Sequence, residues 1–181
     1  MTTEKDELRR HIRKLKAQTG SDALLNESRQ VLQSVEHDAD FLAADTILLY
    51  WSLPDEVNTH DFVRRWAQRK HVLLPRVCGD NLQLATYRSD DDLHAGAFNI
   101  MEPVGTTFTD YPQIRFALIP GMAFDADGHR LGRGKGYYDK LLPQLTNACK
   151  AGICFSFQML ETIPTEHHDV VMDKVFVGTK L

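Results

Sequence analysis

Short apolar runs that alternate with helical segments constrain the fold of this chain more than any other feature. Five such runs occur, at 46–51 (TILLYW), 72–74 (VLL), 116–119 (FALI), 153–155 and 175–177. Strands that alternate with helices are typical of a mainly parallel sheet with helices packed on its faces. We therefore predict an α/β fold. It would be a single three-layer domain over 1–181, with an open, mainly parallel sheet and helices on both faces.

Apolar residues at helical spacing fill much of the chain between these runs. They predict helices over 4–17, 21–35, 59–70 and 136–145. Residues 82–87 alternate between apolar and polar and predict a further strand, whereas the polar stretch 88–113 is expected to form loops and turns. Ligands bind at the carboxyl ends of the strands in such sheets, which points to the segments after Trp51, Leu74 and Ile119.

The composition argues against several classes of protein. The 181 residues carry 21 Lys and Arg against 25 Asp and Glu, a net charge of −4, and 43% of them are apolar. A chain of this length and composition can bury a core, which argues against intrinsic disorder. The negative net charge argues against a nucleic-acid partner bound over a broad basic surface.

The N-terminal segment and the cysteines bear on location. Residues 1–14 are charged and lack the apolar core of a signal peptide, and no apolar run approaches the length of a membrane span. Cys78, Cys149 and Cys154 are odd in number and form no CxxC pair, so neither a disulfide framework nor a zinc site is indicated. All three lie beside apolar residues, which predicts buried, inert thiols. We expect a cytoplasmic protein with no membrane partner.

The segment 120–140 (PGMAFDADGHRLGRGKGYYDK) is the most informative for function. Gly132, Gly134 and Gly136 alternate with Arg133 and Lys135 between a predicted strand and a predicted helix. Glycines allow close approach of the backbone to an anion, and successive N–H groups at a helix N-terminus bind phosphate. The pattern favours a phosphate cradle, with a solvated glycine-rich turn as the alternative.

Two standard phosphate-binding motifs do not fit this segment. A Walker A loop requires GxxxxGK[ST], but His129 occupies the first glycine position and Gly136 follows the lysine. The dinucleotide fingerprint requires GxGxxG, and the segment has GxGxG instead. Any phosphate would therefore be held by a different arrangement.

Other candidate residues each allow two interpretations. Asp139, at the start of the predicted helix, would complement the helix dipole or bind Mg²⁺ beside a polyphosphate, and Asp173 is similarly ambiguous. Lys5, Arg9 and Arg13 share one helix face, which is either solvated or closes over an anionic ligand. In the loop 51–59 (WSLPDEVNT), Trp51 and Glu56 would bind a heterocycle, or the loop merely ends a strand.

No GxSxG or HExxH motif supplies a nucleophile or a zinc site. An enzyme built on this chain would work by positioning and electrostatics, as phosphoryl-transfer enzymes do.

The segment RLGRGKGYYDKLL, preceded by IPGMAFDADGH, resembles the signature of the 5-formyltetrahydrofolate cyclo-ligases. KDELRRHIRK, LYWSLPDEVNT, LLPRV, NIMEPVG and the C-terminal FSFQML…IPTEHHDVVMDKV resemble further blocks of that family in the same order. The resemblance thus spans the chain from about Lys5 to Asp173. It departs at Asp55, Asn58 and Lys140, where the family commonly has Gly, Asp and Arg.

The resemblance implies a reaction in which 5-formyltetrahydrofolate and MgATP give 5,10-methenyltetrahydrofolate, ADP and phosphate. The formyl oxygen would attack the γ-phosphate, and N10 would then close the ring. Arg133, Lys135 and Tyr137 would be the catalytic residues, and Trp51, Glu56, Arg133 and Tyr137 would bind the folate. Asp139 and Asp173 would hold magnesium. ATP would be bound by Lys5, Arg9, Arg130, Leu131, Gly132, Arg133, Gly134, Lys135, Gly136, Tyr137 and Tyr138.

Other functions stay open at this point. A different ATP-dependent ligase or kinase would use the same phosphate cradle with another acceptor. A non-catalytic nucleotide- or folate-binding module would bind without consuming ATP, although a full set of cations and acids is more than binding requires. A nucleic-acid binder is disfavoured by the charge balance. We expect a monomer.

Overall fold

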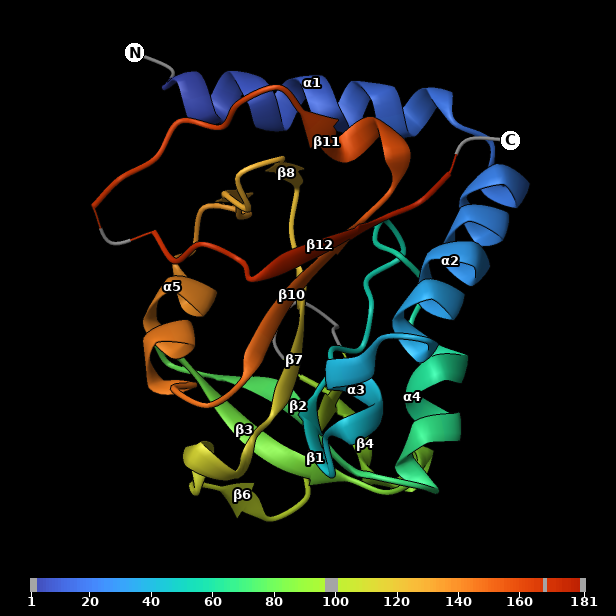
Figure 1. Cartoon of the computed structure of the whole chain (residues 1–181), viewed down its shortest axis with the longest axis vertical. Helices are drawn as coiled ribbons and strands as arrows, with labels where there is room; N and C mark the ends of the chain where they lie inside the picture. The colour runs from blue at the N-terminus through green and yellow to red at the C-terminus, as the bar shows by residue number, and fades with distance from the viewer. Residues whose placement is uncertain (1–2, 97–100, 168, 180–181) are drawn as a thin grey trace.

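The structure is a computed structural model that describes residues 3–96, 101–167 and 169–179. Its centre is a seven-stranded sheet of order β12-β10-β7-β1-β2-β3-β6 (Figure 1). The five strands from β12 to β2 run parallel to one another. β3 pairs antiparallel with β2, and β6 pairs antiparallel with β3. The seven strands are β1 (Thr46–Leu48), β2 (His71–Cys78), β3 (Asn81–Tyr87), β6 (Thr107–Phe108), β7 (Phe116–Pro120), β10 (Cys149–Cys154) and β12 (Lys174–Val177).

Helices cover both faces of this sheet, which confirms the predicted fold class. On one face lie α2 (Ser21–Glu36), α3 (Ala39–Ala43) and α4 (His60–Ala67). On the other lie α5 (Tyr137–Leu141) and a 3-10 turn at Leu142–Gln144. The first helix, α1 (Glu4–Gln18), packs instead on a small sheet of β11 (Met159–Leu160), β8 (Ala123–Asp125) and β9 (Arg130–Leu131). The remaining strands among the described residues, β4 (Leu93–Ala95) and β5 (Met101–Pro103), pair antiparallel with each other.

Alternate residues of the central strands enter two separate apolar clusters. Ile47 and Val72 pack with α2, α3 and α4, whereas their neighbours Leu48 and Leu73 pack with α5 and Phe124. These four strand residues and Phe124 are fully buried. Side chains alternate between the two faces of a strand, so a strand that is buried on both faces reads as a continuous apolar run.

Several strand ends differ from prediction. β10 spans Cys149–Cys154, so it begins four residues before the predicted run 153–155. β1 stops at Leu48 rather than Trp51, and β2 continues through Pro75 to Cys78 rather than ending at Leu74. Beyond Leu73 the ladder of β2 continues only with β3, because β1 has ended. The missing N–H of Pro75 is therefore tolerated, as proline is on an edge strand.

Three other expectations need correction. The helix predicted over 136–145 is short, because Pro143 lies in the 3-10 turn that follows α5. The stretch 88–113, predicted as loops and turns, contains β4, β5 and β6. Cys154 is buried, but Cys149 is only partly buried and Cys78 is exposed, so the prediction of three buried thiols is wrong.

The thiols are free, as the sequence predicts. Burial raises the pKa of Cys154 to about 12 and that of Cys149 to about 11, so both remain protonated near neutral pH. Among the described residues, no helix combines the length and apolar character needed to cross a bilayer.

Candidate active site

A cavity of about 350 Å³ opens where the strand order predicts a ligand site, beyond the carboxyl ends of β1 and β7. Its walls come from the loop after β1, from β2, β3 and β5, and from the glycine-rich segment before α5. A second cavity of about 520 Å³ shares Trp51, Leu53, Glu56 and Met101 with it and extends to α2.

Most of the predicted site residues line the first cavity. They are Trp51, Glu56, Arg130, Gly132, Arg133, Lys135, Gly136, Tyr137, Tyr138 and Asp139. Lys5, Arg9, Leu131, Gly134 and Asp173 are not among its lining residues. The structure therefore brings together segments that lie about 80 residues apart in the sequence.

The path of the glycine-rich loop depends on two backbone conformations. Gly134 and Gly136 have φ of 96° and 68°, values that side-chain-bearing residues rarely adopt. Gly136 caps the N-terminus of α5. A Cβ atom on Gly134 would lie 3.5 Å from the Arg9 guanidinium carbon, an ordinary contact distance, so a side chain here is disfavoured by the backbone conformation and not by a clash with α1.

The N-terminal helix supports this loop rather than forming the cavity wall. Arg9 Nε donates to the carbonyl oxygen of Gly132 at 2.8 Å. Lys5 Nζ lies 2.9 Å from Asp169 and 3.0 Å from Glu166, so it holds a C-terminal segment instead. Leu131 is 1% exposed and packs with Ile12 of α1, which makes its side chain part of the core.

Arg130 and Asp139 form a partly buried pair at the start of α5. Arg130 Nη2 lies 2.6 Å from Asp139 Oδ1, and the Arg130 side chain is 5% exposed. Its guanidinium stands over the ring of Tyr138 at 5.4 Å. Arg130 Nε is buried and has no hydrogen-bond partner among the described residues. A buried donor of this kind fits an anionic ligand that supplies the missing acceptor.

Asp173 does not join Asp139 in the cavity. Asp173 is exposed and lies just before β12. Its Oδ2 accepts a hydrogen bond from the backbone N–H of Lys150 in β10 at 2.6 Å. The two predicted magnesium ligands are therefore not brought together at the cavity wall, where only Asp139 is found.

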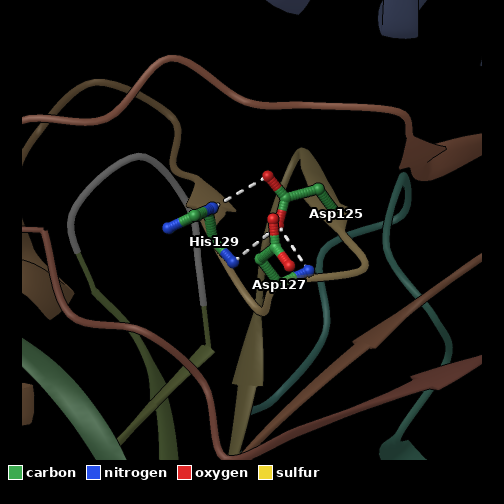
Figure 2. A group of neighbouring side chains, drawn as sticks. All are labelled: Asp125, Asp127 and His129. Atoms are coloured by element: carbon green, nitrogen blue, oxygen red, sulfur yellow. Dashed lines mark hydrogen bonds and ion pairs between the residues drawn. The ribbon is translucent and has the colours of Figure 1, made fainter.

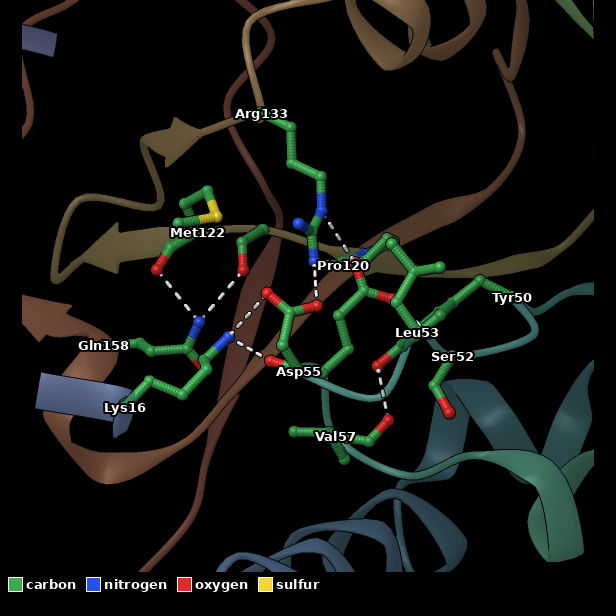
Figure 3. A network of polar contacts seen from close by, with 12 residues as sticks. Lys16, Tyr50, Ser52, Leu53, Asp55, Val57, Pro120, Met122, Arg133 and Gln158 are labelled. Atoms are coloured by element: carbon green, nitrogen blue, oxygen red, sulfur yellow. Dashed lines mark hydrogen bonds and ion pairs between the residues drawn. The ribbon is translucent and has the colours of Figure 1, made fainter. Parts of the chain in front are cut away.

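Arg133 reaches across the cavity to the loop that follows β1. Its Nε and Nη2 donate to Glu56 Oε1 at 3.1 and 2.9 Å, and Nη2 also donates to Asp55 Oδ1 at 2.5 Å. Lys16 of α1 donates to the carbonyl oxygen of Asp55 (Figure 3). Burial opposes the ionisation of Asp55, but Arg133 and Lys16 outweigh it and lower the pKa of this carboxyl.

The aromatic residues of the site occupy distinct positions. The Trp51 ring stacks on His60 with 4.2 Å between centroids and an interplanar angle of 13°. Tyr50 and Tyr138 also line the cavity, and burial raises the pKa of both phenols, so they remain protonated. The Tyr50 hydroxyl donates to the Val57 carbonyl at 3.3 Å, which holds the loop after β1.

Several lining residues were not predicted from the sequence. Pro75, Val77 and Leu82 form an apolar wall, and Met101 and Glu102 of β5 approach from another side. Glu102 Oε1 accepts from the Val77 backbone N–H at 3.0 Å, which attaches β5 to β2. The sequence pointed to these residues only as parts of longer segments, namely the stretch after Leu74, the predicted strand 82–87 and the block NIMEPVG, and no single residue stood out.

A group of Asp125, Asp127 and His129 lies in the turn between β8 and β9 (Figure 2). Both oxygens of Asp125 are already used. Oδ1 accepts from the backbone N–H groups of Asp127 and His129, and Oδ2 from Ile163 N and the His129 ring. The group therefore braces the hairpin that leads to Arg130 and is not assigned a metal.

The chain is similar in sequence and in fold to known proteins. The 5-formyltetrahydrofolate cyclo-ligase of Haemophilus influenzae is 29% identical over 185 residues, covering 98% of this chain and 99% of the relative. The NMR structure of Aquifex aeolicus 5,10-methenyltetrahydrofolate synthetase matches with 31% identity and a TM-score of 0.87, covering 97% of this chain and 90% of that one. The corresponding Mycoplasma pneumoniae structure has 27% identity and a TM-score of 0.78, with 96% and 98% covered.

The model of one protein family matches residues 1–178. It covers both loops that form the cavity and the helix that supports them. The chain belongs to the 5-formyltetrahydrofolate cyclo-ligase family.

Proposed function

We propose that this protein catalyses the ATP-dependent cyclisation of 5-formyltetrahydrofolate to 5,10-methenyltetrahydrofolate, with release of ADP and phosphate. The observation that carries the proposal is one cavity, in a chain of this family, where a cationic glycine-rich loop faces the Trp51–Glu56 loop. One side suits a polyphosphate and the other suits a heterocycle.

Trp51 and Glu56 form the folate side of the proposed site, with Arg133 and Tyr137 beside them. Glu56 offers a carboxylate to adjacent N–H donors of the pterin ring. Its Oε2 accepts from the Leu53 backbone N–H at 3.0 Å, so the side chain is held in place from within its own loop.

The glycine-rich loop and its supports form the nucleotide side. Gly132, Gly134 and Gly136 let the backbone approach the phosphates, and Arg130, Arg133 and Lys135 supply charge. Tyr137 and Tyr138 begin α5 at the cavity wall. Arg9 would act through the carbonyl of Gly132, Leu131 through its backbone, and Lys5 by holding α1 to the C-terminal segment.

The proposed chemistry needs no protein nucleophile. The formyl oxygen attacks the γ-phosphorus, an O–P bond forms, and the bond to the ADP oxygen breaks. N10 then attacks the activated formyl carbon, the C–O bond to phosphate breaks, and the N10 proton passes to solvent. Arg133, Lys135 and Tyr137 line the cavity, and in this proposal they stabilise charge on the transferring group.

Magnesium fits the proposed site at Asp139, because Mg²⁺ takes one or two protein carboxylates and completes its shell with phosphate oxygens and water. When bound, it would neutralise phosphate charge. Asp173 stays a prediction as a second ligand. We also propose that the chain is a single domain over 1–181, a monomer and cytoplasmic, without a nucleic-acid partner.

The first test is ultraviolet absorbance of the purified protein with 5-formyltetrahydrofolate, ATP and Mg²⁺, with each omitted in turn. We expect absorption of the methenyl product only in the complete mixture. Folded protein that consumes ATP with another acceptor, and forms no methenyl product, would contradict the proposal and favour a different ligase or kinase.

A further inference from the structure

Lys16 and Asp55 form a chain of contacts that ends at Arg133. Lys16 lies in the last turn of α1, and its side chain is only 10% exposed. Its Nζ donates to the carbonyl oxygen of Asp55 and lies 3.4 Å from Asp55 Oδ2. Asp55 Oδ1 in turn accepts from Arg133 Nη2 at 2.5 Å (Figure 3). Three segments that are distant in the sequence thus meet at one carboxylate.

The charges of this group balance. Lys16 and Arg133 are cations, and Asp55 and Glu56 are carboxylates, so the four side chains sum to zero. Burial lowers the pKa of Lys16, because its ammonium has lost most of its water, although the nearby Asp55 favours the charged form. An ammonium that is desolvated to this extent needs the carboxylate beside it.

The contacts also restrict Arg133. Its side chain is 38% exposed, and a long cationic side chain at such a position normally samples several rotamers. Here Nε and Nη2 are both bound to carboxylates before any ligand arrives. A planar guanidinium that is held through two nitrogens has its orientation fixed.

We propose that Lys16 and Asp55 are positioning residues, which hold the guanidinium of Arg133 at the cavity in the unliganded protein. Through them α1 and the folate-side loop are tied to the nucleotide-side loop. The effect on turnover rests on the function proposed above, whereas the positioning itself is measurable without any substrate.

The direct test is the side-chain ¹⁵Nε–Hε NMR signal of Arg133 in the unliganded protein, assigned by its loss in Arg133→Lys. We expect a resolved signal that moves toward the free-arginine position in Lys16→Met and in Asp55→Ala. Arg65→Met is the matched control. It breaks an ion pair of 2.7 Å between α4 and α2 away from the cavity, and should leave the signal unchanged. An Arg133 signal that is identical in the wild type, Lys16→Met and Asp55→Ala would overturn the inference.

Kinetics provide a second, independent readout. Misplacing a group that contacts the reacting atoms lowers kcat, so we expect about a tenfold loss in Lys16→Met and in Asp55→Ala. The double variant should be no slower than Asp55→Ala alone, because both act through one chain of contacts. Asp55→Asn, which keeps the oxygen but loses the charge, serves if Asp55→Ala does not fold.

One kinetic result would refute positioning. If Asp55→Ala lowers KM for ATP with kcat unchanged, Asp55 competes with phosphate for Arg133 instead of positioning it. A wild-type protein that makes no methenyl product would contradict the proposed function alone, since the NMR measurement still decides the question of positioning.

Discussion

Two exposed lysines, one in the glycine-rich segment and one in the helix after it, differ in their neighbours. Lys135 lines the cavity, whereas Lys140 of α5 donates to the carbonyl oxygen of Asp80 at 2.8 Å and is not among the cavity's lining residues. A cation that stabilises charge in the transition state contributes to the rate, and a cation away from the site does not. The pair therefore separates a role in catalysis from a general effect of charge.

We expect Lys135→Ala to lower kcat by about 100-fold with the fold intact, and Lys140→Ala to stay within about twofold of the wild type. The measurements are steady-state turnover and circular dichroism. Near-normal turnover in Lys135→Ala would contradict the placement of the phosphoryl group at this loop.

The sequence could single out candidate residues only where local chemistry marks them. The glycines and cations of 130–136 stood out because phosphate binding needs those types at close spacing. The pairing of Arg133 with Glu56 and Asp55 was not predictable, because it joins positions 77 and 78 residues apart. Asp139 was predictable as an acid at a helix start, but its bond to the buried Arg130 was not.

At the scale of elements, the β8–β9 hairpin carries the site, and Asp125 braces it. Burial opposes ionisation of Asp125, but its hydrogen bonds from His129 and Ile163 lower its pKa below the ordinary 3.8. A lowered pKa in the folded state means that the ionised form stabilises the fold. This contribution is complete above about pH 4 and is lost as the pH falls through the folded-state pKa.

Asp125→Ala should lower the free energy of unfolding by about 3 kcal/mol at pH 7, since hydrogen bonds to charged groups are lost and their donors left buried. The difference from wild type should shrink as the pH falls below about 4. Urea denaturation at several pH values measures both. The exposed Asp127→Ala is the control, and an equal loss there would argue against a specific brace.

The helix α1 provides the second prediction at this scale. Arg9→Met removes the bond to Gly132, so we expect the affinity for a non-hydrolysable ATP analogue to fall about tenfold by isothermal titration calorimetry. Arg10, on the next position, is 60% exposed, and Arg10→Met should bind as the wild type does. An equal loss in both variants would indicate a general effect of helix charge.

Element boundaries show why the fold was predicted better than its details. Central strands can be recognised in the sequence as apolar runs, because both of their faces are buried. The extension of β2 through Pro75 depends on where β1 ends, which is a property of its neighbour. The pairing of β4 with β5 depends on tertiary contacts, such as the hydrogen bond from the Val77 N–H to Glu102 Oε1. The sequence of these strands taken alone therefore predicts a loop.

At the scale of the molecule, the small sheet and the central sheet meet at Gly152. A Cβ atom there would lie 2.5 Å from the buried ring of Phe124, which belongs to β8. Gly152 lies in β10, between Ile119 of β7 and Val175 of β12. The absence of a side chain at this position therefore sets how closely the two sheets approach.

Gly152→Ala should destabilise the protein by about 1–3 kcal/mol through overpacking. Gly20→Ala, where a Cβ would meet nothing within 4 Å, is the control and should cost less than about 1 kcal/mol. Adding Phe124→Leu to Gly152→Ala should recover part of the loss, because the two sites share one contact. Strict additivity in thermal or urea unfolding would show that the contact is not responsible.

The attachment of α1 has a consequence for the order of folding. Its contact from Lys5 to Asp169 spans 164 residues, and its contact to Gly132 spans 123. Such distant contacts close late, since the loop entropy must be lost before they form. On the ribosome, α1 is made well before Gly132 and Asp169, the partners that attach it. A nascent chain therefore gains the full support of the glycine-rich loop only after Asp169 has emerged.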